Sequence, residues 1–106
     1  MTTFETDDGN LIVTPDHGDP LRLSLLIPFE DVERWVAIGE REDNKTWLDE
    51  VRLIRPLMPK SASEQLDAMT DGAMVVQCVR EWQRAFSERL GKSLLFSGAG
   101  GVTGQS

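Results

Sequence analysis

A strongly amphipathic segment, residues 71–90, constrains the fold of this chain more than any other feature. Its large apolar residues recur at i, i+4, i+7, i+11 and i+15, which places them on one face of an α-helix. They are Val75, Val79, Trp82, Phe86 and Leu90. Asp71 can cap the start of this helix, and Gly91 stands where a left-handed residue ends many helices. Such a helix must bury its apolar face, so we expect it to pack within a small domain.

Three shorter helices are expected before this segment, at residues 28–39, 45–55 and 61–70. Pro28 suits the first turn of a helix, and Pro56 disfavours helix at the residue before it. The run Ser61-Ala62-Ser63-Glu64 has the pattern of a capping box. The inner faces are expected to carry Val32, Trp35, Val36 and Ile38 in the first helix, Trp47, Leu48, Val51 and Ile54 in the second, and Leu66 and Met69 in the third.

A short β-hairpin is expected near the N-terminus. Leu11–Thr14 and Leu21–Leu25 are β-type runs, and the turn residues Pro15–Pro20 lie between them. Residues 1–10 are polar and expected to be mobile. The fold class is therefore mainly α, a bundle of about four helices in one domain, residues 1–92, with the hairpin at 11–25. Residues 93–106 are expected to form a flexible tail rich in Gly and Ser.

The chain is acidic, and the charge is uneven. Its 106 residues carry a net charge of −7. Eleven acids and three bases up to Asp43 give −8, and seven acids and eight bases from Asn44 give +1. This balance argues against nucleic acid and anionic membranes as ligands. The acidic front half either steers a basic partner or is a solvated surface. A single cysteine and the lack of a membrane-length apolar run predict a cytoplasmic protein.

Few residues offer the chemistry of a metal or catalytic site. His17 lies in the predicted turn and Cys78 in the last predicted helix, so a zinc site is not expected. Asp7-Asp8-Gly9-Asn10 lacks the glutamate that a calcium loop needs six positions after its glycine, and a β-turn is the better interpretation. Cys78 is expected to be a buried apolar residue. We therefore expect no catalytic residues, no cofactor and no metal.

The remaining candidates are apolar and suit protein binding. Tryptophans fall on three predicted helices, and three methionines lie near the centre of the chain. The simplest alternative is that all of them fill the core. Methionine side chains, however, adapt to varied helical ligands, and Leu57-Met58-Pro59 is expected to expose apolar surface at a helix end. We predict a surface for a client or for self-association, formed by Trp35, Trp47, Leu57, Met58, Met69 and Met74.

The order of these segments resembles the tail assembly chaperones of long-tailed bacteriophages, particularly those of actinobacterial hosts. The resemblance covers residues 28–106. It rests on a helical body followed by Leu66-Asp67-Ala68-Met69, Glu81-Trp82-Gln83-Arg84-Ala85, Leu90-Gly91-Lys92-Ser93 and a Ser/Gly tail. It implies a non-enzymatic chaperone in the host cytoplasm that coats the tape measure protein and helps deliver tail tube subunits. It also implies a longer product made by programmed −1 frameshifting, for which residues 90–92 offer a site.

Two other functions are compatible with these observations. The chain could be a small acidic adaptor or antitoxin-like regulator, which would bind a compact basic protein one-to-one. It could also be a small enzyme or an enzyme subunit. A defined pocket with a carboxylate of strongly perturbed pKa would favour the enzyme.

Overall fold

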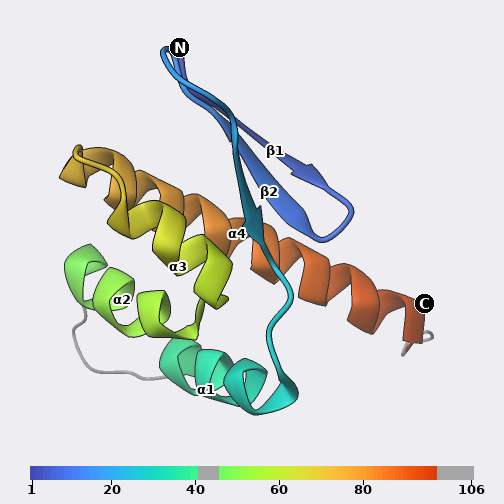
Figure 1. Ribbon diagram of the computed structural model, residues 1–106. Helices are drawn as coiled ribbons and strands as arrows, with labels where there is room; N and C mark the ends of the chain where they lie inside the picture. The colour runs from blue at the N-terminus through green and yellow to red at the C-terminus, as the bar shows by residue number, and fades with distance from the viewer. Residues whose placement is uncertain (41–45, 98–106) are drawn as a thin grey trace.

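The fold is mainly α-helical, as predicted, and carries a small N-terminal sheet. The computed structural model describes residues 1–40 and 46–97, with side chains as far as residue 91. Helix α4 crosses the molecule, with the sheet on one side and the shorter helices on the other (Figure 1). In chain order the elements are β1 (Thr3–Asp7), β2 (Asn10–Thr14), β3 (Leu21–Ser24), α1 (Phe29–Glu40), α2 (Trp47–Ile54), the 3₁₀ turn η1 (Arg55–Leu57), α3 (Lys60–Asp67) and α4 (Gly72–Ser97).

The sheet is antiparallel and has the strand order β1-β2-β3. The predicted hairpin of β2 and β3 is confirmed, with Leu11 opposite Leu23. The expectation that residues 1–10 are mobile is wrong, because β1 pairs with β2 along its whole length. Asp8 and Gly9 form the turn between them with φ of 40° and 88°. Positive φ at both positions matches the tight turn that Asp-Gly favours in hairpins, and this turn sets the register of β1.

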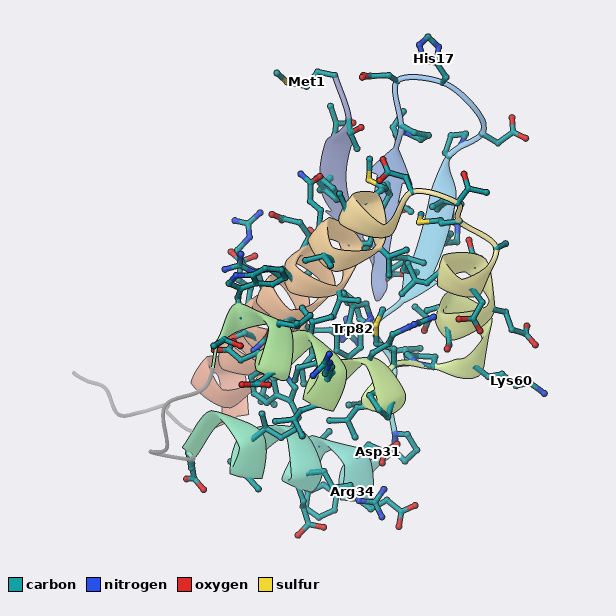
Figure 2. All side chains as sticks on the ribbon, turned by 90° about the vertical axis from the view of Figure 1, so that its left-hand side faces the viewer. Met1, His17, Asp31, Arg34, Lys60 and Trp82 are labelled. Atoms are coloured by element: carbon teal, nitrogen blue, oxygen red, sulfur yellow. The ribbon has the colours of Figure 1, made fainter. Side chains whose placement is uncertain are left out.

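The core lies between the sheet and α4. Leu11, Val13 and Leu23 alternate with outward-facing residues and are almost completely buried. From α4 they meet Val79 and Trp82, which are also fully buried. Figure 2 shows Trp82 at the centre of the molecule, where its ring stacks on Phe86 at 5.4 Å between centroids. The predicted apolar face of the last helix is therefore the face that closes the core.

The outer edge of β3 is covered by side chains from two helices. The Gln65 side chain of α3 donates from Nε2 to the Arg22 carbonyl at 2.9 Å and accepts from the Arg22 N–H at 3.4 Å. Trp82 Nε1 donates to the Ser24 carbonyl at 2.7 Å. These bonds pair backbone groups that an exposed strand would leave to water or to another chain. The sheet is therefore closed on its β3 side.

The helix starts follow local capping chemistry. The Thr46 side chain accepts from the Asp49 N–H at 3.2 Å, and Asp49 accepts from the Thr46 N–H at 3.3 Å, which is a capping box for α2. Asp71 caps α4 as predicted, because its carboxylate accepts from the Ala73 N–H at 3.0 Å.

The predicted bounds of α3 and α4 are wrong. Helix α3 was expected to run to residue 70, but it ends at Asp67. Ser61 does not cap α3, since the helix already begins at Lys60 after Pro59, whose carbonyl accepts from the Ser63 N–H at 2.9 Å. Helix α4 does not end at Gly91 but continues to Ser97. The domain boundary placed at residue 92 therefore falls within α4, and residues 98–106 of the expected tail lie outside the described part of the chain.

Candidate protein-binding surfaces

A pocket of about 300 Å³ lies where the β2–β3 turn meets the turn between α3 and α4. Met69 comes from the α3–α4 turn and Met74 from the first turns of α4, and both are half-buried. Val13 and Leu21 of the sheet also line this pocket. The structure thus brings together two of the six residues predicted for partner binding. We call this site the methionine pocket.

The rim of the methionine pocket is polar and acidic. His17 and Asp19 come from the β2–β3 turn, and Asp71 comes from the start of α4. All three are exposed, and His17 stands at the outer end of the sheet in Figure 2. An apolar floor with carboxylates above it suits an apolar side chain flanked by Lys or Arg. Sequence reasoning assigned His17 only to a turn, and no local pattern places it beside the methionines.

Leu57 and Met58 do not form exposed surface, so this expectation is wrong. Their side chains are 7% and 5% exposed. The 3₁₀ turn η1 folds the chain back between α2 and α3, and the Met58 N–H donates to the Arg55 carbonyl at 3.2 Å. The prolines that were expected to expose this segment instead form a compact turn that directs both side chains inward.

The two predicted tryptophans have different environments. Trp35 is half-buried, and its ring meets Phe86 edge-on at 5.1 Å between centroids. Its indole N–H is buried and has no hydrogen-bond partner among the described residues. Trp47 is 53% exposed and is the first residue of α2, directly after the cap residue Thr46.

Three further large apolar side chains are exposed on α1 and on α2, the helix that carries Trp47. Phe29 is 75% exposed, Val36 and Leu48 are 37% exposed, and Phe29 and Val36 lie seven positions apart on α1. Val36, Trp47 and Leu48 were expected on inner faces, and this expectation is wrong. The spacing of apolar residues predicted the helices, but it did not determine which of these residues the rest of the fold would cover. We call Phe29, Val36, Trp47 and Leu48 the α1–α2 apolar residues.

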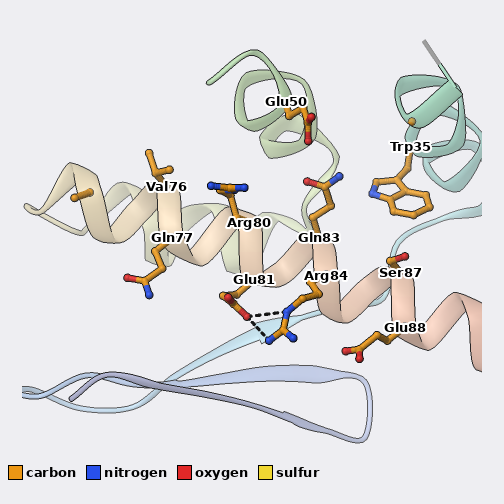
Figure 3. A pocket seen from close by; sticks show the side chains of 12 residues that line it. Trp35, Glu50, Val76, Gln77, Arg80, Glu81, Gln83, Arg84, Ser87 and Glu88 are labelled. Atoms are coloured by element: carbon orange, nitrogen blue, oxygen red, sulfur yellow. Dashed lines mark hydrogen bonds and ion pairs between the residues drawn. The ribbon is translucent and has the colours of Figure 1, made fainter. Parts of the chain in front are cut away.

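A larger, polar groove of about 850 Å³ follows the flank of α4. In Figure 3 Arg80 and Gln83 point toward Glu50 of α2, whereas Glu81 and Arg84 point toward the sheet. Arg84 donates to Glu81 from Nη2 at 2.7 Å and from Nε at 3.2 Å. This hydrogen bond and the charge of Glu81 raise the pKa of Arg84 above its ordinary value. Charged and amide side chains make up most of the residues that line this groove, and Trp35, Ala73 and Val76 contribute apolar surface to it.

The chain's single thiol is fully buried, as predicted. Burial, and to a lesser degree the charge of Glu81, raise the pKa of Cys78 from 9.0 to about 11. The thiol is therefore protonated at neutral pH and a poor nucleophile. Within residues 1–40 and 46–97, no three His, Cys, Asp or Glu side chains gather as ligands for a metal ion.

No protein-family model matches the chain, and comparisons with curated proteins and with solved structures give no match either. Among the helices that the structure describes, none combines the length and apolar character needed to cross a lipid bilayer.

Proposed function

We propose that this chain is a tail assembly chaperone, which binds the tape measure protein, keeps it soluble and assists assembly of the tail tube. The methionine pocket is the observation that carries the proposal. Apolar side chains on a helical client recur on one face, and each needs a site that hides it from water. A pocket of about 300 Å³ between Met69 and Met74 has room for one such side chain.

Methionine suits a client with many different binding segments. Its unbranched thioether side chain changes rotamer at little cost, so the pocket can accept Leu, Ile or Phe in turn. Asp19 and Asp71 at the rim can meet the basic residues of the same helix. Each contact is small, which permits the release that assembly requires.

The α1–α2 apolar residues support the same function. Phe29 and Trp47 expose large rings to water, which costs free energy unless a partner covers them. They give the client, or another copy of the chaperone, further apolar contacts. Trp35 is half-buried, and its ring packs edge-on against Phe86.

Co-expression with the tape measure protein tests this function. We expect the wild-type chain to keep the client in the soluble fraction, and Met69→Ser with Met74→Ser to lose most of that effect. Gln77→Ser is the control, because it also introduces a serine on α4, at an exposed position outside the methionine pocket. Thermal unfolding of each variant separates lost binding from lost fold. A pocket variant that folds and still solubilises the client would refute the pocket's role.

An acidic adaptor remains the second candidate function, favoured by the acids on the sheet. Glu5, Asp7 and Asp8 lie on β1 and its turn, and all are exposed. This function predicts a one-to-one complex with a compact basic protein, whereas the chaperone should bind the client in many copies. Light scattering of the purified complex gives the stoichiometry and separates the two.

A further inference from the structure

The two edges of the sheet differ in whether their backbone groups are paired. On β3, the groups of Arg22 and Ser24 meet Gln65 and Trp82. On β1, the sheet ends, and nothing in the described parts of the chain pairs with this edge. A strand left open in this way is a template on which another strand can add.

The register identifies which groups of β1 face outward. Leu25 donates to the Gly9 carbonyl at 2.8 Å, so Gly9, Leu11 and Val13 are the β2 residues that bond toward β3. Asn10, Ile12 and Thr14 therefore bond toward β1, where their partners are Asp7, Glu5 and Thr3. The remaining residues, Phe4 and Thr6, direct their N–H and C=O groups to the open edge.

The charges beside this edge select the kind of strand that fits. Glu5 and Asp7 share the outer face of the sheet, because side chains alternate along a strand. Both are exposed, and Arg22, at 3.9 Å from Asp7, is the only base within 4 Å of either in the described chain. A strand beside β1 would place its own outer-face residues near these carboxylates. Lys or Arg there would be favoured, and acids disfavoured.

We propose that β1 binds an extended, basic segment of a partner protein as a fourth strand of the sheet. The segment alternates Lys or Arg on the outer face with apolar residues opposite Phe4. A second copy of β1 fits less well, because two antiparallel copies would set Glu5 and Asp7 against the same acids. This site is independent of the proposed chaperone function, which rests on the methionine pocket, and it uses Glu5 and Asp7, which also favour the adaptor function.

Hydrogen exchange with a defined peptide tests the proposal. The probe is a seven-residue peptide that alternates Lys and Val, with blocked ends, and the control peptide alternates Glu and Val. We expect the Lys peptide to slow exchange at the Phe4 and Thr6 amides and to bind more weakly as salt increases. The Glu peptide should leave both amides unchanged. Absence of protection at Phe4 and Thr6 with the Lys peptide would overturn the proposal.

Thr6→Pro tests the backbone bond directly. It removes an outward N–H and keeps the β1–β2 bonds, so the fold should persist, whereas affinity should fall about tenfold or more. Thr6→Val keeps the N–H and should bind as the wild type does. A Lys peptide that is N-methylated along one edge should also fail to bind, which tests the site without changing the protein. Equal binding by Thr6→Pro, or protection of these amides by self-association alone, would contradict the proposal.

Discussion

At the scale of single residues, Trp82 and Trp35 show that a buried indole N–H can be either paired or left without a partner. Trp82 stacks on Phe86, and its Nε1 donates to the Ser24 carbonyl at 2.7 Å. Trp35 contacts the same Phe86, but its buried N–H has no partner in the described chain. The hydrogen bond from Trp82 fixes the end of β3 to α4, whereas Trp35 contributes by packing alone.

Replacing each tryptophan by phenylalanine should separate these contributions. Trp82→Phe leaves the Ser24 carbonyl unpaired and opens a cavity, so we expect the free energy of unfolding to fall by about 2–3 kcal/mol. Trp35→Phe removes an unpaired N–H as well as some packing, so the free energy of unfolding should fall by less than about 1 kcal/mol. Urea unfolding measures both changes. Equal losses would show that the Trp82 hydrogen bond does not stabilise the fold.

Cys78 should make stability fall at high pH. A thiol in the unfolded chain loses its proton near 9.0, whereas folded Cys78 keeps it to about 11. Between these values unfolding releases a proton, so the free energy of unfolding falls as pH rises, by roughly 2–3 kcal/mol in total. Well below pH 9 the thiol is protonated in both the folded and the unfolded chain, so it no longer makes stability depend on pH.

Unfolding curves recorded between pH 8 and 11 test this, with Cys78→Ala as the control. In Cys78→Ala the free energy of unfolding should fall less steeply with pH than in the wild type. At neutral pH the variant should be less stable than the wild type, because the substitution leaves a cavity. If wild type and Cys78→Ala declined in parallel, the thiol would not be the group responsible.

At the scale of secondary-structure elements, two glycines have different roles, one in the β1–β2 turn and one inside α4. Gly9 has φ of 88° in the β1–β2 turn, and an added methyl group would lie in ordinary contact with the Leu26 side chain at 3.5 Å. Gly91 lies within α4, where an added methyl group would meet nothing within 4 Å. The same residue type thus marks a turn in one place and a weak point of a helix in the other.

Alanine substitution should have opposite effects at these two sites. Gly91→Ala should raise the free energy of unfolding by about 0.5–1 kcal/mol, because alanine favours the helix and the site is open. Gly9→Ala should lower it by about 1 kcal/mol or more, because alanine resists positive φ. Thermal unfolding checks both. Destabilisation by Gly91→Ala would mean that the helix ends there, as its sequence suggested.

These glycines also show what sequence could predict. Val75 to Leu90 and the two β-runs carried clear periods, so the apolar face of α4 and the β2–β3 hairpin were predicted correctly, although the end of α4 was not. Strand β1 was missed because Thr3–Asp7 is short, acidic and without a fully buried residue, and its structure depends on pairing with β2. Gly91 is compatible with both a helix interior and a helix end. The choice between them depends on the residues that follow.

At the scale of the whole molecule, the candidate surfaces were harder to predict than the fold. Sequence reasoning named Met69 and Met74, but their pocket is completed by Val13 and Leu21, which are distant in sequence. It placed Leu57 and Met58 at the surface, whereas the turn after α2 buries both. Local patterns identify apolar residues reliably. Which of them face water depends on how three short helices pack against α4.

This division between core and surface predicts that stability and client binding can be changed separately. Leu57→Ala removes a buried side chain and should cost about 2–4 kcal/mol of unfolding free energy. Phe29→Ser combined with Trp47→Ser changes rings that are 75% and 53% exposed, so stability should change by less than about 1 kcal/mol. The double variant should nevertheless keep less tape measure protein soluble. Leu57→Ala should retain this activity at temperatures where it stays folded.

Paired measurements of unfolding and client solubility at one temperature test this separation. Glu33→Ser on α1 provides the control, because it is an exposed position without a large apolar side chain. If the Phe29 and Trp47 variant solubilised the client as well as Glu33→Ser does, the exposed rings would have no part in binding. The methionine pocket would then have to account for binding alone, and its serine variants would decide whether the surface of this fold binds a helical client.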